Sequence, residues 1–184
     1  LEFRRVLFRS VALLVRLESP GPVLFRQLRV GRNMRPFSML KFRSMRHAAA
    51  GSAITRSGDP RVTRLGRVLR ATSLDELPQL VNVLRGEMAL VGPRPLPVDF
   101  QQGGRRFADL VPHYNLRHAV LPGLTGLAQV QGYRSMPDHP VAAARHVAGR
   151  VALDRLYVRR GSLGLDLQLL LATVMRGSWR TNAH

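Results

Sequence analysis

Apolar and polar residues alternate over residues 23–45 in a way that is typical of two short β-strands. The two runs are residues 23–30 (Val-Leu-Phe-Arg-Gln-Leu-Arg-Val) and 36–45 (Pro-Phe-Ser-Met-Leu-Lys-Phe-Arg-Ser-Met), with Gly31-Arg32-Asn33 between them. Glycine and asparagine favour turns because both tolerate a left-handed backbone. The pattern therefore predicts a β-hairpin that carries several basic side chains.

Most of the remaining apolar periodicity is helical. Residues 11–17 have the composition of the end of an apolar helix, which the Ser-Pro-Gly-Pro run after them terminates. Further helices are expected at residues 64–69, 75–84, 142–157 and 163–175. We expect the strongly apolar helix 163–175 to lie in the core rather than on a membrane, because core helices are commoner. In helix 142–157, Arg150 and Asp154 have the spacing of a surface ion pair.

Two stretches rich in proline and glycine are predicted to be loops. Residues 91–95 (Val-Gly-Pro-Arg-Pro) should form a rigid loop that presents Arg94, because the prolines on either side restrict the backbone. Residues 121–126 (Leu-Pro-Gly-Leu-Thr-Gly) predict a second such loop. With the hairpin and helices, these loops indicate an α+β fold: a single, mostly helical domain with a small β-hairpin or sheet.

The length of 184 residues suits one domain with a sizeable core. Residues 1–10 (Leu-Glu-Phe-Arg-Arg-Val-Leu-Phe-Arg-Ser) match no signal peptide and read as a vector-derived or assembly scar, so we place the folded domain at residues 11–184. The absence of cysteine excludes disulfides and thiolate metal sites. No run of about 18 apolar residues occurs, so we expect no membrane-spanning helix in this sequence.

Charge narrows the possible partners. Lys and Arg total 29 against 11 Asp and Glu, a net charge of +18, and every basic residue except Lys41 is arginine. Such a surplus predicts a polyanionic partner: nucleic acid, an anionic membrane surface or nucleotide-type substrates. The sequence has no helix-turn-helix, zinc-finger or RNA-recognition motif, and its 6% aromatic content leaves few platforms for base stacking. We therefore expect no nucleic-acid partner, and keep a basic nucleic-acid- or membrane-binding module without catalysis as the alternative function.

Asp75-Glu76 is the only pair of adjacent acidic residues in the chain. Two carboxylates amid so much positive charge suit a site that handles phosphates through a divalent metal, where one carboxylate attacks and its neighbour helps to hold the metal. A structural interpretation competes, because Ser73-x-x-Glu76 has the spacing of a helix capping box. Spacing alone favours the capping box. The two interpretations are compatible, since backbone N–H groups at a helix start also attract phosphate.

Seven short motifs occur along the chain in an order that resembles one family. They are Ser19-Pro-Gly-Pro22, Lys41-Phe-Arg-Ser-Met45, Thr63-Arg64, Thr72-Ser-Leu-Asp-Glu-Leu-Pro-Gln79, Asn82-Val-Leu-Arg-Gly-Glu87, Val91-Gly-Pro-Arg-Pro95 and Pro122-Gly-Leu-Thr-Gly126. Each motif alone is weak, whereas the ordered set is specific. The chain thereby resembles the bacterial sugar transferases, the monotopic phosphoglycosyl transferases.

The resemblance implies transfer of a sugar-1-phosphate from a UDP-sugar to undecaprenyl phosphate, or another polyprenyl phosphate, with release of UMP. This step commits the sugar to exopolysaccharide, O-antigen (lipopolysaccharide), capsule or glycoconjugate synthesis. The resemblance also implies Mg²⁺ and places the family's Asp-Glu dyad on Asp75 and Glu76. Asp75 would be the nucleophile that forms a phosphosugar intermediate, and both residues would belong to the metal site.

The resemblance also implies a location and further site residues. Family members are membrane-associated catalytic domains at the cytoplasmic face of the bacterial inner membrane, and residues 11–17 correspond to the end of a re-entrant N-terminal helix that is otherwise largely missing. Lys41 and Arg43 differ by two in a strand, so they should project to one face. The residues that we expect to bind substrate are Lys41, Arg43, Arg64, Arg94, Pro95, Gln129 and Arg134.

Overall fold

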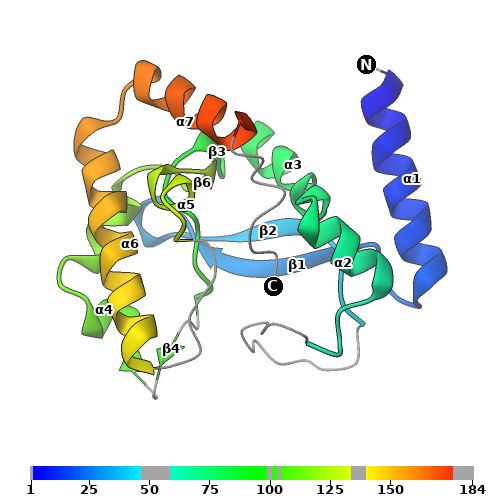
Figure 1. Ribbon diagram of the computed structural model, residues 1–184, viewed down its shortest axis with the longest axis horizontal. Coiled ribbons are helices and arrows are strands. Elements are labelled where there is room, and N and C mark those ends of the chain that lie inside the picture. Colours follow the sequence, from blue (N-terminus) through cyan, green and yellow to red (C-terminus); the bar gives the residue numbers. More distant parts are fainter. Residues whose placement is uncertain (1, 47–58, 99–100, 103–104, 134–139, 176–184) are drawn as a thin grey trace.

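A β-hairpin runs through the middle of the molecule, between two groups of helices (Figure 1). The computed structural model describes residues 2–46, 59–98, 101–102, 105–133 and 140–175. Strand β1 (Leu24–Val30) pairs antiparallel with β2 (Pro36–Phe42), and the 3₁₀ turn η1 (Arg32–Met34) joins them. The predicted hairpin is confirmed, although its second strand ends at Phe42 rather than at residue 45. Asn33 supplies the turn with a positive φ of 54°.

Helix α1 (Glu2–Glu18) lies at one side of the molecule and packs onto the end of the hairpin (Figure 1). Val11 and Val15 are buried in a cluster with Phe42 of β2 and Leu69. The predicted helix over residues 11–17 is therefore confirmed, and it extends into residues 2–10, where the Phe8 ring lies 4.7 Å from that of Phe42. A vector-derived origin of residues 1–10 stays a prediction.

Helices α2 (Arg64–Ala71) and α3 (Gln79–Leu84), with the 3₁₀ turn η2 (Leu74–Glu76) between them, pack beside the hairpin. The predicted helix 75–84 is thus wrong in its first turns, which form η2 and a separate start for α3. The fully buried Asn82 fixes α3 to β2, since it accepts a hydrogen bond from the Leu40 amide (3.0 Å) and donates one to the Ser38 carbonyl (2.8 Å). These contacts fix the distance between η2 and β2.

A short parallel ladder forms where the sequence predicted two loops. Strand β3 (Ala89–Val91) pairs with β6 (Gly123–Thr125), so both predictions are corrected at these residues. A Cβ atom on Gly123 would lie 2.1 Å from the Gly92 amide nitrogen, closer than any side chain permits. The glycines that suggested loops instead allow two backbones to touch. The ladder anchors the segment that carries Arg94.

The remaining elements enclose that segment on the far side from α1. They are β4 (Gln101–Gln102), β5 (Arg105–Arg106), α4 (Phe107–Leu110), η3 (Tyr114–Ala119), α5 (Leu127–Val130), α6 (Pro140–Arg160) and α7 (Leu163–Met175). Val147 and Val151 of α6 are buried against Tyr114 and Leu96. The mixture of helices with small sheets in one domain confirms the predicted α+β class.

Helix α7 only partly fulfils the expectation of a core helix. Leu169 is buried against Val91 and Tyr157, but Leu163 and Leu171 on other positions of the helix are exposed. The sequence is apolar on nearly all sides, so one face remains uncovered after the other has packed. Within the described ranges, no helix has both the length and the apolar character that crossing a membrane requires.

Candidate active site

The Asp75-Glu76 pair lies on η2, a tight turn that packs against β2. Ser73, the residue before the turn, adopts a left-handed conformation (φ 54°, ψ 16°), and its side chain makes no capping hydrogen bond. The capping-box interpretation is therefore wrong, because a cap residue has an extended backbone and a side-chain oxygen that accepts from an amide of the first turn, and Ser73 shows neither feature. The Glu76 amide bonds the Ser73 carbonyl (3.1 Å) instead, so the Glu76 carboxylate is available for other partners.

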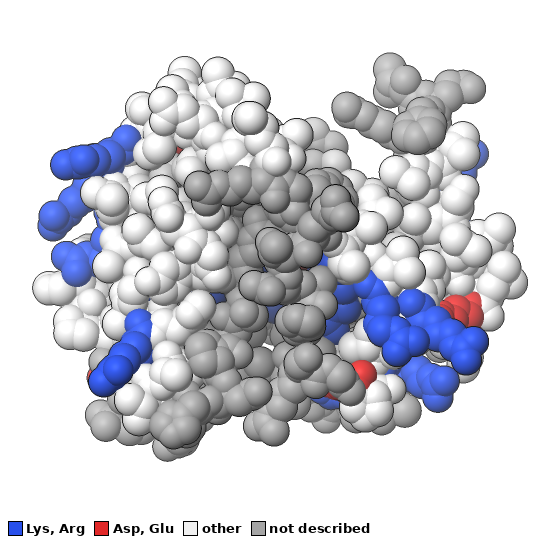
Figure 2. Space-filling view, viewed as in Figure 1, with Lys and Arg blue, Asp and Glu red and all other residues white. Residues whose placement is uncertain are grey.

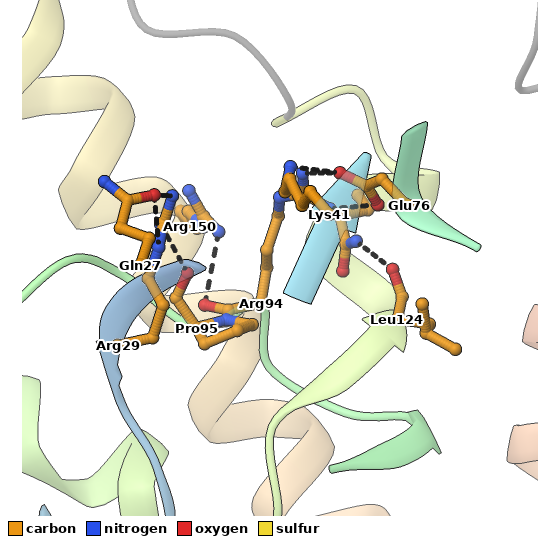
Figure 3. A network of polar contacts seen from close by, with 9 residues as sticks. Gln27, Arg29, Lys41, Glu76, Arg94, Pro95, Leu124 and Arg150 are labelled. Carbon is orange, nitrogen blue, oxygen red and sulfur yellow. Dashed lines mark hydrogen bonds and ion pairs between the residues drawn. The ribbon is translucent and has the colours of Figure 1, made fainter. Parts of the chain in front are cut away.

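Glu76 is held by two cations from separate parts of the chain (Figure 3). Lys41 of β2 donates to Oε1 at 2.8 Å, and Arg94 donates to both carboxylate oxygens, with an Nη1–Oε2 distance of 3.1 Å. Burial alone would raise the pKa of Glu76, but Arg94 and Lys41 overcome it and hold this pKa well below its ordinary value. Glu76 in turn raises the pKa of Arg94. Glu76, Arg94 and Lys41 thus form a partly buried triad of ion-paired side chains.

Asp75 has the opposite environment, although it is the neighbouring residue. It is buried, and its carboxylate makes no hydrogen bond or ion pair with any residue that the structure describes. Burial raises the pKa of Asp75, an effect that the nearby Lys41 opposes and the Glu76 carboxylate reinforces. A carboxylate without a fixed partner, surrounded by charge, has oxygen lone pairs available for attack on phosphorus or for a metal ion.

Further arginines contact the backbone of Arg94 and Pro95, two of which are drawn in Figure 3. Arg29 of β1 donates to the Pro95 carbonyl (3.0 Å), and Arg117 of η3 donates to the Arg94 carbonyl (2.8 Å). Arg150 of α6 lies 3.4 Å from that same carbonyl oxygen. Burial first, then neighbouring cations, lower the pKa values of Arg29 and Arg150 to about 9, so both stay charged at neutral pH.

The predicted surface pair of Arg150 with Asp154 is wrong. Both residues are buried. Asp154 pairs instead with Arg117, whose Nε and Nη2 lie 2.9 Å and 2.7 Å from Oδ2 of Asp154. Helical spacing shows which residues share a face, but not whether that face is exposed. Sequence reasoning missed the contacts of Arg29 and Arg117 with the Arg94 loop, because residues of β1 and η3 meet that loop only in the folded chain.

The other residues that the sequence assigned to substrate binding are not all brought together. Lys41 and Arg94 meet at Glu76, and Pro95 lies beside Arg94. Arg43 is buried and donates to the carbonyls of Val15 (3.1 Å) and Ser19 (2.6 Å), so the structure places it at the end of α1 rather than beside Glu76.

Three further assignments differ in their outcome. Arg64 is exposed at the first position of α2 and forms no part of the triad. Gln129 of α5 is buried and donates to the Leu124 carbonyl (2.8 Å), a contact that supports the backbone beside β6. Arg134 lies outside the described residues.

A family model described as bacterial sugar transferase matches residues 3–180 of the chain. An exopolysaccharide production protein, PSS, of Rhizobium leguminosarum bv. phaseoli is 47% identical over 168 residues, which cover 90% of this chain and 82% of that protein. The UDP-glucose:undecaprenyl-phosphate glucose-1-phosphate transferase of Escherichia coli K12 is 43% identical over 91% of this chain and 35% of its own length.

A third relative, from Aeromonas hydrophila, is named a UDP-N-acetylgalactosamine-undecaprenyl-phosphate N-acetylgalactosaminephosphotransferase. It is 42% identical over 91% of this chain and 38% of its own length. The chain thus spans most of the Rhizobium protein but little more than a third of the other two relatives.

Proposed function

Because this chain belongs to the bacterial sugar transferase family, we propose that it transfers a sugar-1-phosphate from a UDP-sugar to undecaprenyl phosphate and releases UMP. The names of the Escherichia and Aeromonas relatives share this phosphotransfer to undecaprenyl phosphate and differ in the sugar. The product would enter exopolysaccharide synthesis, as the name of the Rhizobium relative suggests, or the synthesis of a related surface glycan.

The observation that carries this proposal is a contrast: Asp75 has no hydrogen-bonding partner among the described residues, whereas Lys41 and Arg94 hold Glu76. A phosphoryl-transfer site needs one reactive oxygen together with fixed positive charge that stabilises the phosphate. Lys41 and Arg94 bind Glu76, and together with Arg70 they also favour the charged form of Asp75. Three cations beside two carboxylates leave positive charge for a donor phosphate.

The reaction would proceed in two displacements at one phosphorus atom. An Asp75 oxygen attacks the β-phosphorus of the donor, and the bond from that phosphorus to the bridging oxygen breaks with its electron pair, so UMP departs. The sugar-phosphate then remains on Asp75 as an acyl phosphate. An oxygen of undecaprenyl phosphate attacks the same phosphorus, and Asp75 leaves as a free carboxylate. Arg94 and Lys41 would lower the repulsion between the attacking anions and the diphosphate.

The described residues fit a magnesium ion that is shared with the substrate. Mg²⁺ is commonly held by one or two carboxylates plus substrate phosphates and water. No group of three or more acidic or histidine side chains able to hold a metal occurs within the described ranges, so a closed protein cage is not formed there. Asp75, with Glu76 beside it, would hold the ion. When bound, Mg²⁺ would neutralise charge that develops on the departing phosphate.

We also propose that the chain acts at the cytoplasmic face of the bacterial inner membrane, where a lipid acceptor and a nucleotide donor can meet. Leu13 and Leu17 of α1 and Leu171 of α7 are exposed apolar side chains suited to a lipid interface. Figure 2 shows Lys and Arg side chains gathered over the α2 end of the molecule and along α6. Such basic surface favours anionic lipid headgroups.

The proposal is tested by UMP release from a panel of UDP-sugars, with undecaprenyl phosphate and Mg²⁺ in detergent or nanodiscs. Intact-protein mass spectrometry after incubation with donor and Mg²⁺, without lipid, should show a sugar-phosphate adduct that maps to Asp75. UMP release that requires the lipid from the first turnover, with no adduct, would reject the covalent route. Absence of UMP release with every donor, together with tight nucleic-acid binding, would favour the alternative of a basic binding module.

A further inference from the structure

We propose that Arg117, held in place by Asp154, is a positioning residue that aims Arg94 at the reacting phosphate. The inference rests on the proposed function, since it assigns Arg94 a role in the same site. It concerns how the loop of residues 92–97 keeps one geometry without being part of a helix or a sheet.

Side chains from three separate elements contact backbone carbonyls of this loop, and Figure 3 shows two of them, Arg29 and Arg150. Arg117 of η3 donates to the Arg94 carbonyl at 2.8 Å, with Arg150 of α6 at 3.4 Å from the same oxygen. Arg29 of β1 donates to the next carbonyl, that of Pro95, at 3.0 Å. These arginines therefore hold the backbone at Arg94 and Pro95, while the Arg94 guanidinium extends toward Glu76.

Arg117 and Arg150 are both buried, but of the three arginines only Arg117 is shown in an ion pair, with the buried Asp154, among the described residues. Its side chain is 0% exposed and that of Asp154 is 2% exposed, whereas Arg94 itself is 27% exposed. A buried ion pair is weak evidence for stability, because removing two charges from water offsets most of their attraction. Apolar side chains would fill this space with less penalty. The pair is better explained by the directed hydrogen bond that it gives to the Arg94 carbonyl.

The shape of the guanidinium explains why arginine is used. Its planar fork lets Nε and Nη2 contact Asp154 while Nη2 also reaches the Arg94 carbonyl. A lysine at this position would keep the charge and the attraction to Asp154, but its single ammonium cannot reproduce both directions. Arg117→Lys therefore separates positioning from charge. A displacement of about 1 Å at a catalytic group can lower the rate on the order of 100-fold.

The experiment is a double-mutant cycle on kcat/KM for the UDP-sugar, with wild type, Arg117→Lys, Arg94→Ala and the double variant. We expect Arg117→Lys alone to lower kcat/KM by roughly 10- to 100-fold. It should cause no further loss when Arg94 is already alanine, because its effect passes through Arg94. Losses that multiply in the double variant would overturn the proposal. Arg106→Lys is the matched control, since it alters an exposed Arg–Asp pair with no contact to the site.

A second cycle needs no enzymatic activity and so separates this inference from the proposed function. The stability coupling between Arg94 and Glu76 is measured by urea unfolding of Arg94→Ala, Glu76→Gln and their double variant, first in the wild-type background and then in the Arg117→Lys background. A smaller coupling in the Arg117→Lys background supports positioning, and an unchanged coupling overturns it. If Arg117→Lys does not fold, Asp154→Asn replaces it in both cycles, because asparagine keeps the size and one acceptor oxygen.

Discussion

The two neighbouring carboxylates of the η2 turn have opposite environments. Glu76 is held by Lys41 and Arg94, and its pKa is lowered. Asp75 is buried without a hydrogen-bonding partner among the described residues, and its pKa is raised. Glu76 therefore contributes stability as an anion, whereas ionised Asp75 is a source of instability. The free energy of a poorly stabilised carboxylate falls further on bonding to phosphorus or a cation than that of a carboxylate that is already paired.

The most severe test of this contrast is Asp75→Asn. The amide keeps the shape of the side chain but cannot act as the nucleophile, so we expect kcat to fall on the order of 10⁴-fold or more. The fold should survive, because the substitution removes a buried charge to which no residue in the described part of the chain donates a hydrogen bond. Measurement of UMP release together with a thermal melt checks both parts. Turnover near the wild-type level would remove Asp75 from the mechanism.

Arg94→Ala removes the side chain that joins Glu76 to the proposed phosphate site. Loss of one preorganised donor typically lowers kcat by about 10²- to 10³-fold, and we expect a reduction of that size in UMP release. Arg106→Ala provides the control, since Arg106 pairs only with the exposed Asp109 among the described residues. A lowered melting temperature with unchanged kinetics would show instead that Arg94 has only a structural role.

Glu76→Gln should destabilise the protein, in contrast to Asp75→Asn. Lys41 and Arg94 would both lose their anionic partner while remaining partly buried, at a cost of roughly 1–3 kcal/mol in the free energy of unfolding. Turnover should fall as well, with a weaker apparent affinity for Mg²⁺. Urea unfolding measures the first effect, and a magnesium titration of UMP release measures the second. Unchanged stability would mean that water screens the triad completely.

The pH dependence of stability sharpens the same comparison, because the two pKa shifts have opposite signs. Asp75 has a raised pKa, so its ionisation destabilises the fold as the pH rises through that value, and Asp75→Asn should be more stable than wild type at pH 7. Glu76 has a lowered pKa, so its contribution is present at pH 7 and is lost as the pH falls through that lowered value.

Melting temperatures of both variants and wild type, measured from pH 7 to about pH 4 near the ordinary pKa of Asp, test these signs. The advantage of Asp75→Asn should shrink steadily toward the acidic end. The deficit of Glu76→Gln should persist over most of the range, because the pKa of Glu76 lies lower. If both variants melted above wild type at pH 7, or both below it, the proposed contrast would be contradicted.

The smallest expected effect is that of Ser73→Gly. A left-handed conformation costs a residue with a Cβ about 1–2 kcal/mol, which glycine avoids, while the added freedom of the unfolded chain offsets part of the gain. We expect a change in stability of less than about 1 kcal/mol, on the stabilising side. A clear drop in melting temperature would indicate that the Ser73 hydroxyl makes a contact that matters for the fold.

Local patterns sufficed for the hairpin and for most helices because those elements are fixed by neighbouring residues. The alternation over residues 23–45 and the helical periodicity of residues 142–157 each correspond to one face of a single element. The Asp75-Glu76 pair and the place of Arg94 between two prolines in a loop also have local signals in the sequence. The structure brings Lys41 and Arg94 together at Glu76, whereas binding of substrate by these two residues stays a prediction.

The incorrect predictions share a different cause, since the structure at each of these residues depends on segments far apart in the chain. Ser73-x-x-Glu76 has the sequence of a cap, but Lys41 and Arg94 hold the Glu76 side chain elsewhere. Arg117 and Asp154 are 37 residues apart, and nothing in their spacing indicates contact. Arg43 had the right spacing from Lys41 to share a strand face, but β2 ends one residue before it.

The backbone contact between β3 and β6 has a consequence for genetic experiments. Gly92 and Gly123 have no side chain that could take part in catalysis, but a methyl group on Gly123 would collide with the Gly92 amide. Even alanine there would force the two segments apart and carry the Arg94 loop with them. In a saturation-mutagenesis screen that reads only glycan output, these two glycines would rank beside Asp75 as intolerant. A parallel measurement of protein abundance would show the difference, since alanine at either glycine should deplete the folded protein and Asp75→Asn should not.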